Sequence, residues 1–111
     1  KDSLDMDDAD RQIIFDAVAA SEASHILITH GTDTMVLTGR LLSTITGKTI
    51  VMTGAMQPWR VRGSDAEFNV GFALAAAQTL PAGVYVAMNG QIFDPLKAEK
   101  DRAGSRFVAK A

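Results

Sequence analysis

The sequence predicts a three-layer α/β/α sandwich with a mainly parallel sheet. Segments in which apolar residues recur at helical spacing alternate with short apolar runs rich in β-branched residues, and this alternation is typical of parallel α/β folds. Turn-forming residues bound each apolar run, as expected of strands buried on both faces. With 111 residues the chain is long enough for one hydrophobic core, so we expect residues 1–111 to form a single domain.

The first four expected elements are a helix, a strand, a second helix and a second strand. An apolar stripe preceded by the possible cap residues Asp7 and Asp8 predicts the first helix. A similar stripe that ends before Gly47, a credible C′ residue, predicts the second helix. The expected ranges are 9–22 and 34–46 for the helices, and 25–29 and 48–53 for the strands.

The second half is expected to contain a loop, a helix and two further strands. Residues 54–63 form the loop, and the spacing of Ser64 and Glu67 is that of a capping box that opens an alanine-rich helix ending before Pro81. Residues 83–88 are the third apolar strand, and a turn and a short strand at 91–93 follow it. We expect the polar tail from Lys97 onwards to be a loop.

Composition excludes several classes of function. Apolar residues make up 47% of the chain and charged residues 22%, the net charge is −2, and no apolar run is long enough for a membrane helix. The basic residues are scattered, which argues against nucleic-acid binding. The chain has no cysteine and only two histidines, without an HExxH context, so we expect no metal site and a reducing, cytoplasmic compartment. No glycine-rich nucleotide motif is present, and we expect no cofactor.

Polar or glycine-containing turns follow the predicted strands, and ligands of parallel α/β sheets bind where such turns meet. The turn after the first strand places the Thr32 hydroxyl and the Asp33 carboxylate at a helix N-terminus, where backbone N–H groups favour an anion. This pair suits an ammonium ligand and a positioned water, but Thr and Asp are also common helix caps. Gly54 and Ala55, after the second strand, would let a ligand approach the backbone or would simply form a turn.

Three stretches resemble one known family, the bacterial-type (type I/II) L-asparaginases and related amidohydrolases. The segment ITHGTDTM at 28–35 is similar to the family's second active-site signature. The segment VMTGAMQP at 51–58 is similar to its next strand and loop, and KDSLDM at 1–6 to its upstream serine loop. The resemblance spans essentially the whole chain and implies the same fold.

The resemblance also implies site residues. Thr32 and Asp33 match the family's catalytic pair, and Asp33 also takes the α-ammonium group of the substrate. Lys100 matches the lysine that completes a catalytic triad with them. Ser3 matches the serine that holds the α-carboxylate, and Ala55 the position whose backbone faces the leaving amide. The family's sites are completed across subunit contacts, so the resemblance implies a homo-oligomer that binds a small amino-acid substrate.

The leading functional hypothesis is an amidohydrolase that converts L-asparagine to L-aspartate and ammonia. The family keeps its nucleophilic threonine in a glycine-rich loop after a first strand, upstream of residue 1. We therefore expect a preceding segment, and we expect residues 1–111 alone to be inactive and to leave an open sheet edge along residues 26–28. The alternatives are an amidotransferase component that delivers ammonia to a partner, and a non-catalytic module that binds an amino acid.

Overall fold

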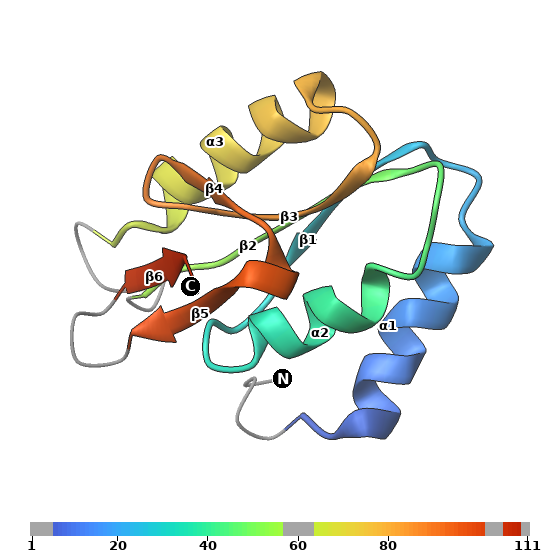
Figure 1. The fold of residues 1–111 in the computed structure, drawn as a ribbon. Coiled ribbons are helices and arrows are strands. Elements are labelled where there is room, and N and C mark those ends of the chain that lie inside the picture. Colours follow the sequence, from blue (N-terminus) through green and yellow to red (C-terminus); the bar gives the residue numbers. More distant parts are fainter. Residues whose placement is uncertain (1–5, 57–63, 102–105, 110–111) are drawn as a thin grey trace.

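The computed structural model describes residues 6–56, 64–101 and 106–109 (Figure 1). The elements, in chain order, are α1 (Asp8–Ala20), β1 (His25–Thr29), α2 (Met35–Leu42), β2 (Thr49–Thr53), α3 (Ala66–Thr79), β3 (Gly83–Met88), β4 (Gln91–Phe93), the 3-10 turn η2 (Pro95–Lys97), β5 (Ala98–Asp101) and β6 (Arg106–Ala109). Of the described residues, none belongs to a helix long and apolar enough to cross a membrane.

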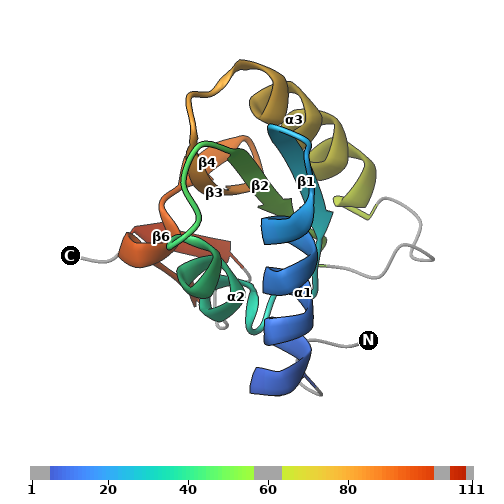
Figure 2. The ribbon, with the colours of Figure 1, turned by 90° about the vertical axis from the view of Figure 1, so that its right-hand side faces the viewer.

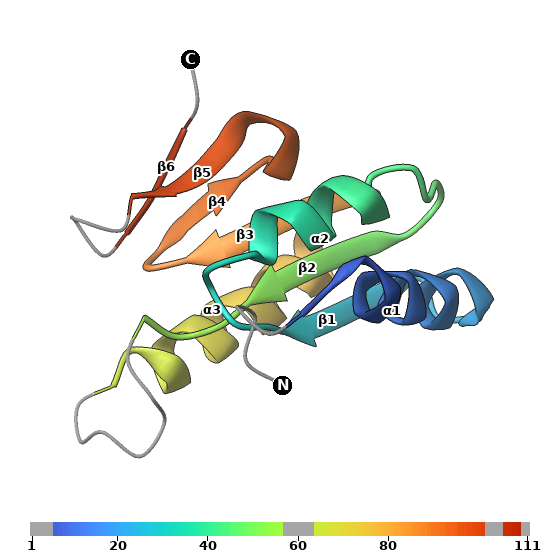
Figure 3. The same cartoon turned by 90° about the horizontal axis from the view of Figure 1, so that it is seen from below.

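The main sheet has the strand order β1-β2-β3-β4, which Figure 3 shows from below. β1, β2 and β3 are parallel, and β4 returns antiparallel to β3. Figure 2 shows three layers, with α3 on one face of the sheet and α1 and α2 on the other. The predicted sandwich with a mainly parallel sheet is therefore confirmed.

The two faces of β2 build two separate parts of the core. All five residues of β2 are buried, and successive side chains on a strand point to opposite faces. Ile50 and Met52 pack in the cluster that contains Met35 and Leu42 of α2, whereas Val51 packs with alanines of α3. The small alanine side chains let α3 lie close to the sheet.

The helix boundaries differ from the sequence expectation in several places. α1 spans Asp8–Ala20 and not 9–22, although its N-cap is Asp7, one of the two expected cap residues, which forms a reciprocal capping box with Asp10. α2 ends at Leu42, earlier than expected, because the hydroxyl groups of the next two residues bond back to carbonyl oxygens of the last turn. Gly47, with φ 77°, therefore lies in the turn before β2 and is not the C′ residue. At α3 the expected capping box is wrong, because Asp65 is the N-cap and makes no side-chain capping bond.

The expectation of a loop from Lys97 onwards is wrong. Residues 98–101 and 106–109 form the antiparallel pair β5–β6. β5 was not predicted because only one of its faces packs against the rest of the protein. Ala98 is fully buried on that face, whereas Glu99, on the opposite face, is exposed. In β6, Phe107 is buried and its ring lies 6.2 Å from that of Phe93. Because most residues of β5 are charged, that strand shows little alternation of hydrophobicity along the sequence.

β1 lies at the edge of the main sheet. Among the described residues it pairs with β2 alone, and Ile26, Leu27 and Ile28 are only half-buried. An apolar strand with one open edge offers its unpaired backbone groups to another strand. This arrangement agrees with the open edge expected along residues 26–28, and the identity of any strand that pairs there stays a prediction.

Candidate active site

Thr32 and Asp33 lie in the short turn that joins β1 to α2. The backbone N–H of His30 donates to the carbonyl of Thr53 at 2.8 Å, which holds the start of the turn against the end of β2. Thr34 is the N-cap of α2, so the turn places both side chains directly before a helix N-terminus. Thr32 is buried, with 7% of its surface exposed, although its hydroxyl is polar.

Lys100 of β5 reaches this turn from the far end of the sequence. Its Nζ donates a hydrogen bond to Thr32 Oγ1 at 2.8 Å and another to Asp33 Oδ1 at 2.7 Å. The side chains of Lys100 and Asp33 are only 16% and 22% exposed. The structure thus brings together the hydroxyl, carboxylate and ammonium groups that the family resemblance singled out, although Lys100 is 67 residues from Asp33.

This arrangement can move protons. A hydroxyl that accepts a hydrogen bond from an ammonium group keeps its own hydrogen to donate to a third group. A carboxylate beside the ammonium balances the charge at a largely shielded place, where charge-assisted hydrogen bonds are short and strong. Thr32 Oγ1 can therefore pass a proton between Lys100 and a reacting group or water.

His30 holds the shape of the Thr32 turn, and no motif in the sequence pointed to this role. Its Nδ1 lies 2.6 Å from the Gly31 carbonyl oxygen and its Nε2 lies 2.9 Å from Thr38 Oγ1. A carbonyl oxygen can only accept, so Nδ1 carries a hydrogen and the Nε2 of the neutral ring accepts from the Thr38 hydroxyl. Burial lowers the pKa of His30. The signal available in the sequence was its position directly before Gly31.

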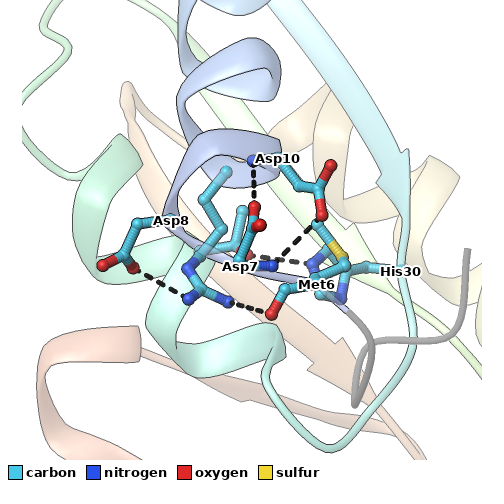
Figure 4. Close-up of polar contacts among 7 residues, drawn as sticks. Met6, Asp7, Asp8, Asp10 and His30 are labelled. Carbon is cyan, nitrogen blue, oxygen red and sulfur yellow. Dashed lines mark hydrogen bonds and ion pairs between the residues drawn. The ribbon is translucent and has the colours of Figure 1, made fainter.

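The N-terminal end of α1 packs beside His30 (Figure 4). A cavity of about 270 Å³ lies between them and is lined by Met6, by residues of α1 and by residues 29–31 at the end of β1 and the start of the turn. Arg11 spans this end of the helix, because its guanidinium donates to the Met6 carbonyl and to Asp8 Oδ1. The positive charge of Arg11 further lowers the pKa of His30, after the larger effect of burial.

The loop after β2 approaches the Thr32 turn so closely that only glycine fits there. A Cβ atom at Gly54 would lie 2.2 Å from the backbone oxygen of His30. Ala55, the next residue, is half-buried on the same loop. The predicted substrate residue Ala55 therefore lies on a loop that touches the turn carrying Thr32, whereas Ser3 lies outside the described residues.

A buried asparagine ties the two ends of the β2–α3 loop to the β3–β4 turn at this end of the sheet. Asn69 of α3 is fully buried. Its Nδ2 donates to the Gly54 carbonyl at 2.9 Å and to Asp65 Oδ2 at 3.0 Å, and its Oδ1 accepts from the Asn89 N–H at 2.8 Å. The same Asp65 oxygen accepts from the backbone of Met56. The sequence predicted no role for Asn69, because two of its three partners, Gly54 and Asn89, are distant in the chain.

The described residues include no group of three or more His, Asp or Glu side chains that could hold a metal ion.

Comparison with known proteins identifies relatives of this chain in one family. The family described as "Asparaginase, N-terminal" matches residues 1–108. A glutaminase-asparaginase of Acinetobacter glutaminasificans is 39% identical over 83 residues, which are 70% of this chain and 25% of that protein. One component of the glutamyl-tRNA(Gln) amidotransferase of Methanococcus vannielii is 41% identical over 76 residues, 67% of this chain and 18% of that protein.

Solved structures of L-asparaginases are also similar to this chain. The thermostable L-asparaginase of Thermococcus kodakarensis is similar with a TM-score of 0.87 and 33% identity, over 98% of this chain and 35% of that one. L-asparaginase I of Vibrio cholerae gives a TM-score of 0.83 and 32% identity over the same shares. The chain thus spans between about a fifth and a third of the length of these relatives.

Proposed function

Because the chain belongs to the asparaginase family, we propose that it contributes the proton-transfer and ammonium-binding part of a site that hydrolyses L-asparagine to L-aspartate and ammonia. The observation that carries this proposal is the double hydrogen bond from Lys100 to Thr32 and Asp33. Lys100 differs from a solvent-exposed surface lysine, because its ammonium group bonds to two side chains of a half-buried turn, and one of them is the buried hydroxyl of Thr32.

In the proposed reaction a threonine hydroxyl attacks the side-chain amide carbon of asparagine. The new C–O bond forms as the hydroxyl loses its proton, and the C–N bond breaks as the nitrogen gains one and leaves as ammonia. Water then attacks the resulting ester and releases aspartate. In each half-reaction the proton passes through the Thr32 hydroxyl to Lys100 in its neutral amine form. The resulting ammonium group then returns a proton to the leaving nitrogen in the first half-reaction, and to the threonine oxygen in the second. The fixed geometry of Thr32 and Lys100 lowers the entropic cost of both.

Asp33 is proposed to bind the α-ammonium group of the substrate. Its carboxylate already accepts from one cation, Lys100, and two carboxylate oxygens can serve two cationic donors. Ser3 is proposed to hold the α-carboxylate, and the backbone at Ala55 to face the leaving amide. The attacking threonine is proposed to lie in a segment that precedes residue 1 and that pairs with the open edge of β1.

A second function is favoured by one comparison. A protein 41% identical over 76 residues is named as a component of an amidotransferase. In that case the same site would release ammonia from a side-chain amide for transfer to an acceptor held by a partner. The third reading, a module that binds an amino acid without catalysis, keeps Asp33 but has no need of Lys100.

The test measures ammonia released from asparagine and from glutamine by the full-length natural protein, by residues 1–111 alone, and by two site variants and one control variant of the full-length protein. We expect Lys100→Met and Thr32→Val each to lower kcat at least about a hundredfold, and residues 1–111 alone to be inactive. Thr44→Val, which changes an exposed hydroxyl far from the turn, is the matched control and should keep full activity. Full activity of Lys100→Met would refute the proposal.

Two further readouts separate the alternatives. Ammonia release that depends on added glutamyl-tRNA and a partner protein would favour the amidotransferase. Calorimetric binding of aspartate with no turnover by the full-length protein would favour the non-catalytic module. The homo-oligomeric state implied by the family and the cytoplasmic location inferred from the absence of cysteine remain parts of the proposal, and sedimentation of the purified protein tests the first.

A further inference from the structure

Arg40, in the last turn of α2, joins that helix to the segment that leads into β5. Its Nε donates to the carbonyl oxygen of Pro95 at 3.0 Å, and its Nη2 donates to that of Ala98 at 3.3 Å. The donors of a guanidinium group are fixed relative to one another in a plane. Two bonds from this one group therefore fix both the place and the direction of the segment.

The register of β5 decides which charge faces Asp33. Side chains alternate along a strand, and accordingly Ala98 is fully buried, Glu99 is exposed and Lys100 is half-buried. If β5 slipped by one residue along α2, Glu99 would take the place of Lys100. A second carboxylate would then face Asp33, and like charges at such a distance repel.

The helix α2 meets the 3-10 turn η2 at the residue before Arg40. A Cβ atom at Gly39 would lie 2.7 Å from the Cβ of Pro95, so the two segments touch at this glycine. Pro95 is itself fully buried. The segment 95–101 is thus joined to α2 and its preceding turn at two places, by Arg40 near the end of the helix and by Asp33 ahead of its start. Figure 1 shows β5 alongside α2.

We propose that Arg40 is a positioning residue for Lys100. By holding the carbonyl groups of Pro95 and Ala98, it sets the register of β5 and so places the Lys100 ammonium group between Thr32 and Asp33. The catalytic consequence rests on the proposed function, but the placement of Lys100 can be measured without any activity. The hydrogen bonds of Arg40 go to the carbonyl oxygens of Pro95 and Ala98, so we infer that it acts on Lys100 through β5.

The test compares Arg40→Gln with the unchanged full-length protein. Trace labelling with acetic anhydride, followed by mass spectrometry of peptides, gives the rate at which Lys100 is acetylated. Lys48 is the internal reference, because it lies before β2 at the opposite end of the sheet, where its Nζ bonds to the carbonyl oxygens of Ser21 and Ala23. Lys97→Gln is the matched control, since it removes an exposed positive charge from the same segment without touching either Arg40 bond.

We expect the Lys100-to-Lys48 labelling ratio to rise roughly tenfold in Arg40→Gln, because two hydrogen bonds from a charged donor are lost. The ratio should stay unchanged in Lys97→Gln. Under the proposed function, kcat of Arg40→Gln should also fall about a hundredfold, with a smaller change in KM, because the reacting groups are misplaced. Should Arg40→Gln fail to fold, Arg40→Lys replaces it, with an expected rise of about threefold since a lysine reaches one carbonyl at a time.

An unchanged labelling ratio in a folded Arg40 variant overturns the proposal, even if its melting temperature falls, because that pattern describes a purely structural arginine. A raised ratio in a protein that hydrolyses neither asparagine nor glutamine supports the positioning of Lys100 by Arg40 while the proposed function fails. The two proposals therefore have separate outcomes.

Discussion

The contact between Gly54 and the Thr32 turn makes a sharp prediction for the substitution Gly54→Ala. The added Cβ would lie 2.2 Å from the His30 backbone oxygen and 3.1 Å from the terminal methyl carbon of Met35. Real Cβ atoms do not approach a backbone oxygen so closely, and the oxygen belongs to backbone that the bond from His30 N–H to Thr53 already holds. The loop after β2 and the Thr32 turn must therefore move apart.

Overpacking of a tightly packed site costs about 1–3 kcal/mol, and we expect the upper end, about 3 kcal/mol, because neither neighbouring segment is a flexible side-chain end. Gly71→Ala is the matched control. Gly71 lies inside α3, and among the described residues no atom outside the helix's own backbone lies within 4 Å of the position of an added Cβ. Alanine there should therefore stabilise the protein by roughly 0.5–1 kcal/mol through its higher helix propensity.

The assay is urea unfolding followed by circular dichroism for the two variants and the unchanged protein. We expect the midpoint to fall for Gly54→Ala and to rise for Gly71→Ala, with the same dependence on denaturant. Labelling of Lys100 should also increase in Gly54→Ala, since the turn that holds its partners is displaced. If Gly54→Ala unfolds within about 0.5 kcal/mol of the unchanged protein, the close approach of the two loops is refuted.

Three further predictions concern single side chains. The pKa of His30 is near 6.5 in the unfolded state, and burial lowers the pKa in the folded state. Neutral His30 should therefore contribute its full stabilisation above pH 6.5, and this contribution should be lost as the pH falls towards the lowered pKa. Urea unfolding of His30→Gln should lack that part of the pH dependence, and parallel stability-versus-pH curves for the two proteins would contradict the prediction. Asn69→Leu leaves the Gly54 carbonyl and the Asn89 N–H without a buried partner and should lower the free energy of unfolding by about 3 kcal/mol, whereas a loss below about 1 kcal/mol would show that water or new bonds replace it. Asp33→Asn should abolish calorimetric binding of aspartate by the full-length protein, because the charge that pairs with the α-ammonium group is gone; unchanged affinity would make Asp33 a structural residue of the turn.

Short apolar runs bounded by turn residues were enough to predict the strands. The runs 25–29 and 83–88 were predicted with the bounds that the structure has, and 48–53 with one extra residue. The same reasoning placed Thr32 and Asp33 in a turn at the carboxyl end of the sheet, because parallel strands all end on one edge. These are local properties, since burial on both faces of a strand leaves its signature in the residues of that strand.

The sequence by itself therefore determined the α/β class, the parallel strands and the turn that carries Thr32 and Asp33. Its periodicity gave no sign of β5 and β6, and Lys100 could be assigned only through a family resemblance. The tertiary structure decided the pairing of Lys100 with Asp33, the glycine contact at Gly54, the junction of two loops at Asn69 and the hydrogen bond from Arg40 to Ala98. Apart from the bond between Asn69 and Asp65, each of these contacts joins side chains or backbone groups far apart in the chain. Burial and charge at such positions depend on the distant partner and not on the neighbouring residues.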